Sequence, residues 1–306
     1  MAAVLLIGIL LAQQEFSSVF TAHGQVSIEG FGPAIRAHVS GCGADGWTDS
    51  SGKFVVSGKV KAGGYLGCSL NVTLPGAQAQ NVPLAAPAGS MQLGMILLKP
   101  DVKGAKPGTI SFLSLQAPAE VAKLKKKAQE LSARNDWQGA ERNLEAALKK
   151  YETDPEGWMG LGLALKRQAK PSEAAFQRAS ELDPRYVLPL LELALSSLAR
   201  KDWENAAHFA RQSIAINPGA SPEARLYLAT ALLNTGDFAE AENESRLAWE
   251  QSNATLQRAN YVRGIALVKL ERVDEAKALL REYARVVAGT DEAKRVLGVI
   301  ENLPNK

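Results

Sequence analysis

The chain has 306 residues, of which 22% are charged, and its 35 basic and 32 acidic side chains leave a formal net charge of +3. This length suffices for one or two domains with a substantial hydrophobic core. The near balance of charge gives no electrostatic support for a nucleic-acid partner. The densest basic cluster, residues 123–127, is expected to be a solvated helix face.

An uncharged apolar run occupies residues 2–12 and is followed at once by polar residues. The run is shorter than the roughly 20 apolar residues of a membrane-spanning helix, but it fits the apolar core of a signal peptide. We therefore predict a signal peptide over residues 1–22, with cleavage after Ala12 or, as second choice, after Ala22. The mature chain would be exported to the periplasm or the outside of a bacterial cell. No Lys or Arg precedes the run. An uncleaved membrane anchor is the alternative interpretation of the segment.

The two cysteines, Cys42 and Cys68, both lie in the first third of the chain. An even count in an exported chain favours one disulfide, which would close a loop of roughly 25 residues. Two buried free thiols and half of a metal site are the alternatives. The cysteines make a poor zinc site, because there is no CxxC motif and no pair of histidines nearby. We predict a structural disulfide and no metal or other cofactor.

Short runs of β type, broken by Gly, Asp, Ser and Pro, occupy the region before residue 100. The four residues 49–52 predict a hairpin turn, in which Gly52 supplies the unusual backbone angle. Regularly spaced short strands with turn signals are typical of a β-sandwich, which we place at residues 23–100. The candidate strands are residues 25–29, 35–39, 53–56, 68–74 and 91–98.

Residues 47–54, which read Trp-Thr-Asp-Ser-Ser-Gly-Lys-Phe, match a T-D-x-x-G-x-F pattern of strand, turn and strand. Leu74, Pro75 and Gly76 stand where a second turn would follow. The region thereby resembles the carboxypeptidase regulatory-like (transthyretin-like) domain, although its opening strand lacks that family's usual G-x-V-x-D continuation. The resemblance implies a non-catalytic accessory module.

Residues 101–117 are predicted to be a linker, because prolines and glycines interrupt any regular pattern there. Within it, residues 109–113 are a candidate for a final strand packed on the sandwich. We place the boundary to the second domain near residue 117.

A short phrase recurs through the second half of the chain at a spacing of about 34 residues. It consists of a small or polar turn, a large apolar residue, an acid or amide, and an alanine that opens a second helix. Two closing prolines, Pro184 and Pro218, lie one such repeat apart. The copies begin at Asn135, Lys201, Gly236 and Glu271, with a divergent copy at Ala169.

Residues 118–288 resemble an array of about five tetratricopeptide repeats. In that family, small residues let two helices approach closely while large ones fill the space between them. The fourth copy has the large Leu228 and the small Ala229 and Ala241 at such positions. One helix pair cannot bury its apolar surface alone, so the repeats stack into a solenoid. The second copy is shorter than the others, and we expect its helices to be shortened or shifted. Residues 289–306 predict a capping helix with Thr290 as its N-cap.

The predicted fold class is therefore multidomain, with an all-β sandwich followed by an all-α tetratricopeptide repeat solenoid. The resemblance implies that partners bind the concave face, which the first helix of each pair lines. A largely apolar groove suits a peptide with hydrophobic anchors, whereas packing within the solenoid or against the β domain is the alternative for each residue. The groove positions carried over from the family are Lys125, Gln129, Met159, Leu163, Leu191, Leu195, Leu226, Thr230, Tyr261 and Ile265.

The chaperone-binding subgroup of this family clamps a terminal carboxylate with Lys, Asn and Arg side chains. Of the clamp positions only Lys125 matches, because Gly160, Leu188 and Glu192 occupy others. We therefore reject that clamp for this chain.

The sequence contains no HExxH, GxSxG, Walker or GxGxxG motif, and its three histidines form no zinc-binding pair. We predict that it is not an enzyme but an adaptor that binds a protein or peptide partner, with membrane contact only through an uncleaved N-terminal segment. One alternative is carbohydrate or cell-wall binding by the sandwich, for which Trp47 and Tyr65 are the aromatic candidates. Another is a structural protein that self-associates through its terminal repeats.

Overall fold

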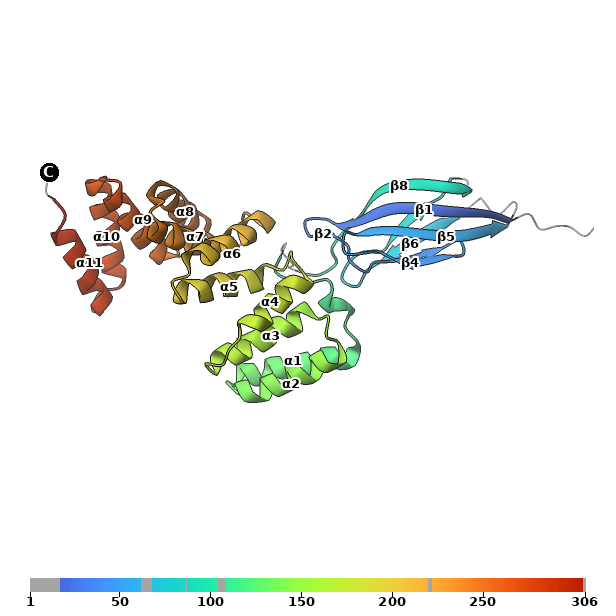
Figure 1. Cartoon of the computed structure of the whole chain (residues 1–306), viewed down its shortest axis with the longest axis horizontal. Coiled ribbons are helices and arrows are strands. Elements are labelled where there is room, and N and C mark those ends of the chain that lie inside the picture. The colour runs from blue at the N-terminus through green and yellow to red at the C-terminus, as the bar shows by residue number, and fades with distance from the viewer. Residues whose placement is uncertain (1–16, 62–67, 86, 104–107, 220–221, 305–306) are drawn as a thin grey trace, which may run out of the picture. The chain divides into compact units, whose positions relative to one another are not determined.

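The structure is a computed structural model that describes residues 17–61, 68–85, 87–103, 108–219 and 222–304. The chain divides between Lys103 and Gly104 into two compact parts, which we call the β unit and the helical unit and describe separately (Figure 1). The predicted order of an all-β part followed by an all-α array is confirmed. The apolar run 2–12 and the cleavage site after Ala12 lie outside the described residues, as does Tyr65.

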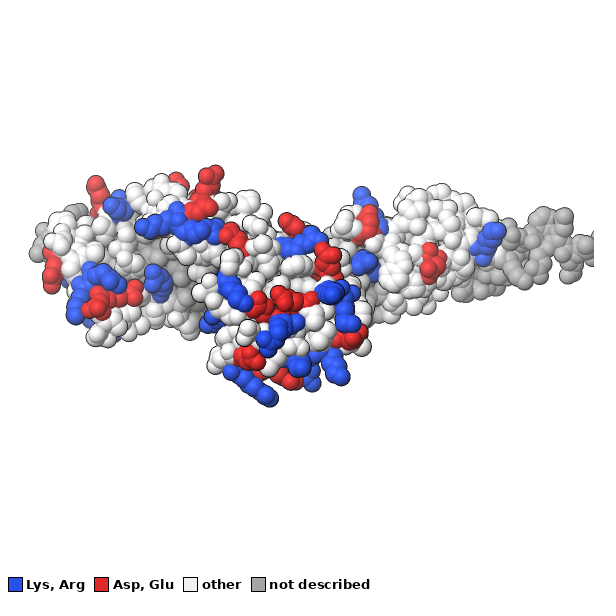
Figure 2. All heavy atoms as spheres, turned by 60° about the horizontal axis from the view of Figure 1, so that its bottom comes forward, with Lys and Arg blue, Asp and Glu red and all other residues white. Residues whose placement is uncertain are grey.

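No helix in the described ranges is long and apolar enough to span a membrane. Charged side chains are few on the part of the β unit that Figure 2 brings forward, whereas both signs are interspersed over the helical unit. Many of the charges on the helical unit pair between neighbouring helices, as Arg225 does with Glu244 at 2.7 Å.

The β unit consists of two four-stranded sheets. In sheet A the central strand is β1 (Ser17–Ile28), which pairs on one side with the parallel strand β8 (Gly89–Leu98). On its other side β1 pairs with two antiparallel strands, β5 (Lys53–Lys61) and β2 (Gly32–Pro33). Sheet B is antiparallel throughout, in the order β4 (Ala44–Trp47), β3 (His38–Gly41), β6 (Ser69–Thr73) and β7 (Gln80–Pro83).

The core of the β unit comes from alternate residues of both sheets. Phe20, Ala22 and Val26 of β1 are fully buried, as are Leu70 and Val72 of β6. Successive side chains of a strand point to opposite faces, so this alternation buries one face of each sheet and leaves the other exposed. The predicted sandwich is therefore present.

Strand β1 begins earlier than the sequence led us to expect. It starts at Ser17, so the domain start predicted at residue 23 falls inside the strand. Ala22, the second-choice cleavage site, is fully buried and pairs with both β5 and β8. Cleavage there would remove the first half of the strand on which sheet A is built. The structure therefore contradicts the second-choice site.

Residues 49–52 form the predicted turn. The N–H of Gly52 donates to the carbonyl of Asp49 over 3.0 Å, and Gly52 has a φ of +77°. Any Cβ at Gly52 would lie 2.3 Å from the carbonyl oxygen of Val26, so only glycine fits. The turn does not close a hairpin, because β4 belongs to sheet B and β5 to sheet A. It carries the chain from one sheet to the other.

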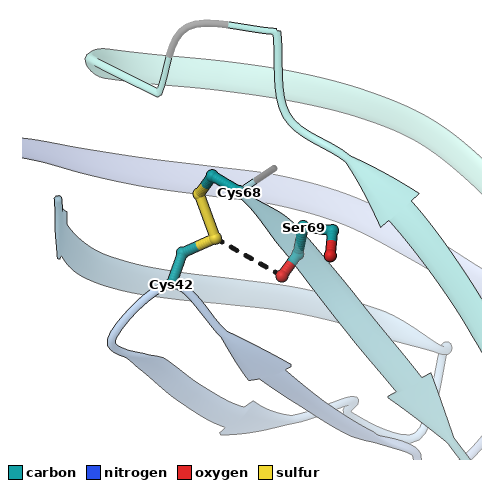
Figure 3. Close-up of a disulfide and its surroundings, with 3 residues drawn as sticks. All are labelled: Cys42, Cys68 and Ser69. Carbon is teal, nitrogen blue, oxygen red and sulfur yellow. Dashed lines mark hydrogen bonds between the residues drawn. A yellow bond between two sulfur atoms is a disulfide. The ribbon is translucent and has the colours of Figure 1, made fainter. Parts of the chain in front are cut away.

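The predicted disulfide joins Cys42 to Cys68 with an S–S distance of 2.05 Å (Figure 3). Cys42 and Gly43 make the two-residue turn between β3 and β4, and both have positive φ angles, as a tight hairpin of this length requires. The Sγ atom of Cys42 lies 3.4 Å from the carbonyl oxygen of Ser69 at the start of β6. The bridge thus ties the β3–β4 hairpin to β6.

The helical unit forms five antiparallel helix pairs and a final helix within its described residues. The first helices of the pairs are α1 (Ala119–Ala133), α3 (Pro155–Arg167), α5 (Val187–Ala199), α7 (Pro222–Thr235) and α9 (Gln257–Lys269). The second helices are α2 (Trp137–Lys150), α4 (Glu173–Leu182), α6 (Trp203–Ile216), α8 (Phe238–Gln251) and α10 (Val273–Val286), and α11 (Asp291–Glu301) follows.

The recurring phrase marks the turn within each pair. Two aspartates of the phrase cap the second helix: Asp136 accepts from the N–H of Gly139 at 2.8 Å, and Asp202 from that of Asn205 at 3.2 Å. The backbone at the first residue of the phrase is left-handed in every copy, with positive φ at Asn135, Ala169, Lys201, Gly236 and Glu271.

The alanine of the phrase is part of the buried core in the regular copies. Ala140, Ala206, Ala241 and Ala276 are all fully buried. The second copy is shortened, as predicted: α4 has 10 residues, whereas the other second helices have 14. Its expected alignment is wrong by one residue, because Ala174 is exposed and Ala175 is buried.

Residues 108–117 belong to the helical unit, contrary to the predicted linker, and residues 109–113 form no strand. The hydroxyl of Ser111 donates to Oδ2 of Asp183 over 2.6 Å, and the N–H of Val187 donates to the carbonyl of Gly108 over 2.8 Å. The short helix η1 (Ser114–Gln116) follows. These bonds hold the segment against the helix pairs, so the boundary lies at 103/104 and not near 117.

The final helix α11 caps the last pair. The hydroxyl of Thr290 accepts from the N–H of Ala293 at 3.2 Å, which confirms the predicted N-cap. Val296 and Ile300 of α11 are buried against Leu280 and Tyr283 of α10. The hydroxyl of Tyr283 also donates to Oε1 of Glu292 over 2.8 Å.

Alkaline pH is expected to weaken this cap. Burial, together with the hydrogen bond to Glu292, raises the pKa of Tyr283 to about 12. The unfolded chain releases the proton near pH 10, so the stabilisation is complete below that pH and is lost as the pH rises through 12. Urea unfolding of the native chain and of Tyr283→Phe checks this: the difference in unfolding free energy should shrink between pH 9 and pH 11.5. A constant difference would contradict it.

Candidate binding groove of the helical unit

A hollow of about 640 Å³ lies between the first helices of the first two pairs, α1 and α3. Side chains of η1 and α2 complete its lining. The lining is mainly apolar, with a few polar groups, as in sites that bind small ligands or the side chains of a peptide. Its residues are Ser114, Leu115, Ala117, Ala122, Lys125, Lys126, Ala128, Gln129, Ser132, Trp137, Leu144, Glu156, Gly160 and Leu163.

Small residues on α1 and α3 are part of the lining of this hollow. Ala122 and Ala128 line it from α1, and Gly160, which has no side chain, lines it from α3. The first helices of the last three pairs lie closer, since α5 contacts α7 and α7 contacts α9 directly. The hollow therefore lies in the part of the array where the first helices are further apart.

Lys125 stands at the edge of the hollow within a polar network. Its Nζ atom lies 2.9 Å from Oδ2 of Asp154 and 3.2 Å from Oε2 of Glu156. Asp154 is fully buried at the start of α3 and also accepts a hydrogen bond from the hydroxyl of Ser114. A buried carboxylate needs such a partner, because an unpaired charge in the interior is costly. Lys125 therefore ties α1 to the start of α3 and is not free to clamp a carboxylate.

Three of the predicted groove residues come together in the hollow: Lys125 and Gln129 on α1 and Leu163 on α3. Leu191 and Leu195 of α5 lie further along the array, half-buried and exposed, respectively. The half-buried Thr230 of α7 turns its hydroxyl to its own helix, where it donates to the carbonyl of Leu226 at 2.7 Å.

Two predicted groove residues are core residues instead. Met159 is buried in a cluster with Phe176 and Leu193, and Leu226 is buried in a cluster with Ala229 and Val262. Both lie on the faces of their helices that pack within the array, so the groove positions taken from the family were misplaced there.

Tyr261 and Ile265 of α9 are half-buried against the capping end. The ring of Tyr261 lies 5.2 Å from that of Tyr283, centroid to centroid. Their contacts join the last pair to α11, so their packing role is clear from the structure.

Several lining residues were missed by sequence reasoning. Ser114, Leu115 and Ala117 line the hollow from a segment that we had assigned to a linker. Trp137 and Leu144 reach it from α2, although family positions place the groove on first helices alone. The signal available in the sequence was Ser114, a polar residue between two leucines. It did not reveal that this segment packs on the helix pairs, because its partner Asp154 is 40 residues away.

No group of three or more His, Cys, Asp or Glu side chains in the described ranges could hold a metal ion. The hollow offers shape, apolar surface and hydrogen-bonding groups. These features are those of a binding site.

Residues 125–184 and 197–255 each match a tetratricopeptide repeat family model. Among curated proteins none matches the chain. The chain is similar to the solved structure of MamA 41-end from Desulfovibrio magneticus RS-1, with 15% identity over 57% of this chain and 99% of that one and a TM-score of 0.50. It is also similar to a tetratricopeptide repeat protein from Parabacteroides merdae ATCC 43184, with 17% identity over 60% and 73% of the two chains and a TM-score of 0.51. At these identities the likeness concerns the fold, and the helical unit is an array of tetratricopeptide repeats.

Proposed function

We propose that the chain is an exported, non-catalytic adaptor that holds a protein or peptide partner in the groove of its tetratricopeptide repeats. Repeat arrays of this kind present extended concave surfaces for binding. The observation that carries the proposal is the open hollow between α1 and α3, which is lined by three of the groove residues carried over from the family.

The lining of the hollow selects the kind of partner. Leu115, Leu163, Trp137 and Leu144 offer apolar surface to one bulky apolar side chain. Gln129 is exposed beside them, and its amide can both donate to and accept from a peptide backbone. A peptide segment with a hydrophobic anchor residue fits this arrangement.

Export is the second part of the proposal. Disulfides persist in oxidising compartments, and the Cys42–Cys68 bridge supports such a location together with the apolar run 2–12. Cell fractionation tests it: the chain should be found outside the cytoplasm, and deletion of residues 2–12 should retain it inside.

We also propose that the β unit is a carboxypeptidase regulatory-like domain, supported by the turn at residues 49–52. A sequence-profile match of an orthologue to another sandwich family would contradict that assignment.

Filling the hollow is expected to weaken partner binding strongly. Ala122 is exposed on α1 and lines the hollow, so Ala122→Trp places an indole where the anchor side chain would lie without disturbing the core. Peptides selected by the native chain from a phage-displayed random library should share a bulky apolar residue. They should bind Ala122→Trp at least about tenfold more weakly, as loss of a central anchor does elsewhere.

The matched control is Ala133→Trp, which alters an exposed alanine at the end of the same helix outside the hollow. Its binding should equal that of the native chain. Equal binding by Ala122→Trp would remove the groove from the proposal. A second test is capture of partners from an envelope extract by the native chain. If it captures only further copies of itself, a self-associating structural protein becomes the better description.

A further inference from the structure

The outer face of sheet B carries an exposed tryptophan that is held in a fixed orientation. Trp47, the last residue of β4, is 61% exposed. Its ring stacks on that of His38, with 4.5 Å between centroids and 29° between planes. His38 is held in turn by Asp45, with 2.7 Å between Nε2 and Oδ1. An aromatic ring held exposed in a fixed orientation presents its free face for stacking by a ligand.

Polar side chains continue the same face across the sheet. The strand register places Trp47 beside His38 and His38 beside Thr73, which forms one row. A second row runs from Asp45 through Ser40 and Asn71 to Asn81. Four strands at their usual spacing span about 14 Å.

The hydrogen-bonding groups of this face are available. Asn71 is exposed, and Ser40 and Thr73 are half-exposed. Among the described residues, none bonds to the side chains of these three. Hydroxyl and amide groups can both donate and accept, so they suit a ligand that carries many hydroxyl groups.

The charge of the face narrows the ligand class. Asp45 is the only Asp, Glu, Lys or Arg in the four strands of sheet B. A nucleic acid or another polyanion would need cationic side chains. The outer face of sheet A differs, since it presents Lys53 and Lys59 among exposed aliphatic side chains such as Met95.

We infer that the outer face of sheet B binds a neutral oligosaccharide. One sugar ring lies with its C–H face on the indole of Trp47, because the negative face of the aromatic ring attracts the weakly positive C–H groups. Hydroxyl groups of the neighbouring sugar bond to Asp45, Ser40 and Asn71. The site belongs to the β unit and does not depend on the groove proposed for the helical unit.

Calorimetric titration of the full chain tests the inference. The probes are the hexasaccharides of β-1,4-glucose, α-1,4-glucose and β-1,4-N-acetylglucosamine, with hexagalacturonate as the charged comparison. At least one neutral probe should bind, and Trp47→Ala should weaken its binding about tenfold or more. Trp47→Phe, which keeps an aromatic platform, should restore most of the affinity, and Asn71→Ala should have a smaller effect than Trp47→Ala.

Two controls separate this site from other causes. Met95→Ala removes a side chain that is 68% exposed on the opposite sheet and should leave sugar binding unchanged. Ala122→Trp should weaken peptide binding and leave sugar binding intact, so the two proposals fail separately. The inference is overturned if no neutral probe binds at millimolar concentration, if only hexagalacturonate binds, or if folded Trp47→Ala binds as the native chain does.

Discussion

Replacement of Phe176 by alanine is expected to lower the stability of the helical unit by about 3–5 kcal/mol. Phe176 is fully buried on α4 and packs with Met159 of its own pair and Tyr186 and Leu193 of the next. Its removal leaves a cavity at the junction of the second and third pairs. Whole domains are stable by only about 5–15 kcal/mol, so this single change removes a large part of the total.

The same packing predicts an unusual result at Gly162 on α3. A Cβ there would lie 2.4 Å from the ring of Phe176, so Gly162→Ala is expected to destabilise the unit by about 1–3 kcal/mol through overpacking. Intrinsic helix propensity alone would favour alanine by about 1 kcal/mol. Urea unfolding followed by circular dichroism at 222 nm measures both variants.

Gly298 of α11 provides the matched control, because a Cβ there would have no atom within 4 Å. Gly298→Ala should therefore raise stability slightly, with the opposite sign to Gly162→Ala. Equal effects of the two substitutions would show that Gly162 is not held small by Phe176. The double variant Gly162→Ala with Phe176→Leu should recover part of the loss, since leucine leaves room for the added methyl group.

Removal of the disulfide is expected to lower the stability of the β unit by about 3 kcal/mol. The bridge joins residues 26 positions apart, and without it the unfolded chain gains the entropy of that loop. The bridge also holds the β3–β4 hairpin beside β6 through Cys68. The effect should therefore be largest in sheet B.

Hydrogen exchange with and without a reductant measures this effect strand by strand. Amides of β3 and β6 should exchange roughly a hundredfold faster after reduction, which corresponds to about 3 kcal/mol at 1.4 kcal/mol per factor of ten. Amides of the helical unit serve as the internal control and should not change. A Cys42→Ser and Cys68→Ser double variant should be insensitive to the reductant. Unchanged exchange in β6 of the native chain would contradict the prediction.

The repeats were predictable because the residues that build them are local. The recurring phrase lies within one turn. Its Asp136 and Asp202 cap the helices that follow them by accepting from N–H groups only three residues away. In the four regular copies its alanine is buried because these copies pack in the same way, so a periodic sequence reports a periodic core. The error at Ala174 arose where the period was broken, since no neighbouring copy could set the alignment.

The β unit was predictable in kind and less so in extent. Alternating strands and the turn ending in Gly52 indicated a sandwich. The start of β1 was missed because Ser17–Ala22 pair with β5, and Phe20–Ala22 also pair with β8. Both partner strands are distant in the sequence, and nothing in the segment itself records them. The pairing of Cys42 with Cys68 was simpler, since only two cysteines were available.

The sequence by itself determined the class of the molecule: a sandwich with one bridge, followed by helix pairs whose repetition makes a groove. Only the tertiary structure decided which residues face that groove. Met159 and Leu226 are buried and Lys125 is held by Asp154 because helices that are distant in sequence meet there. The stacking of Trp47 on His38 was likewise invisible, since it depends on the register of two strands. Local hydrogen bonds and periodic packing can be read from neighbouring residues, whereas a binding surface is formed by long-range contacts.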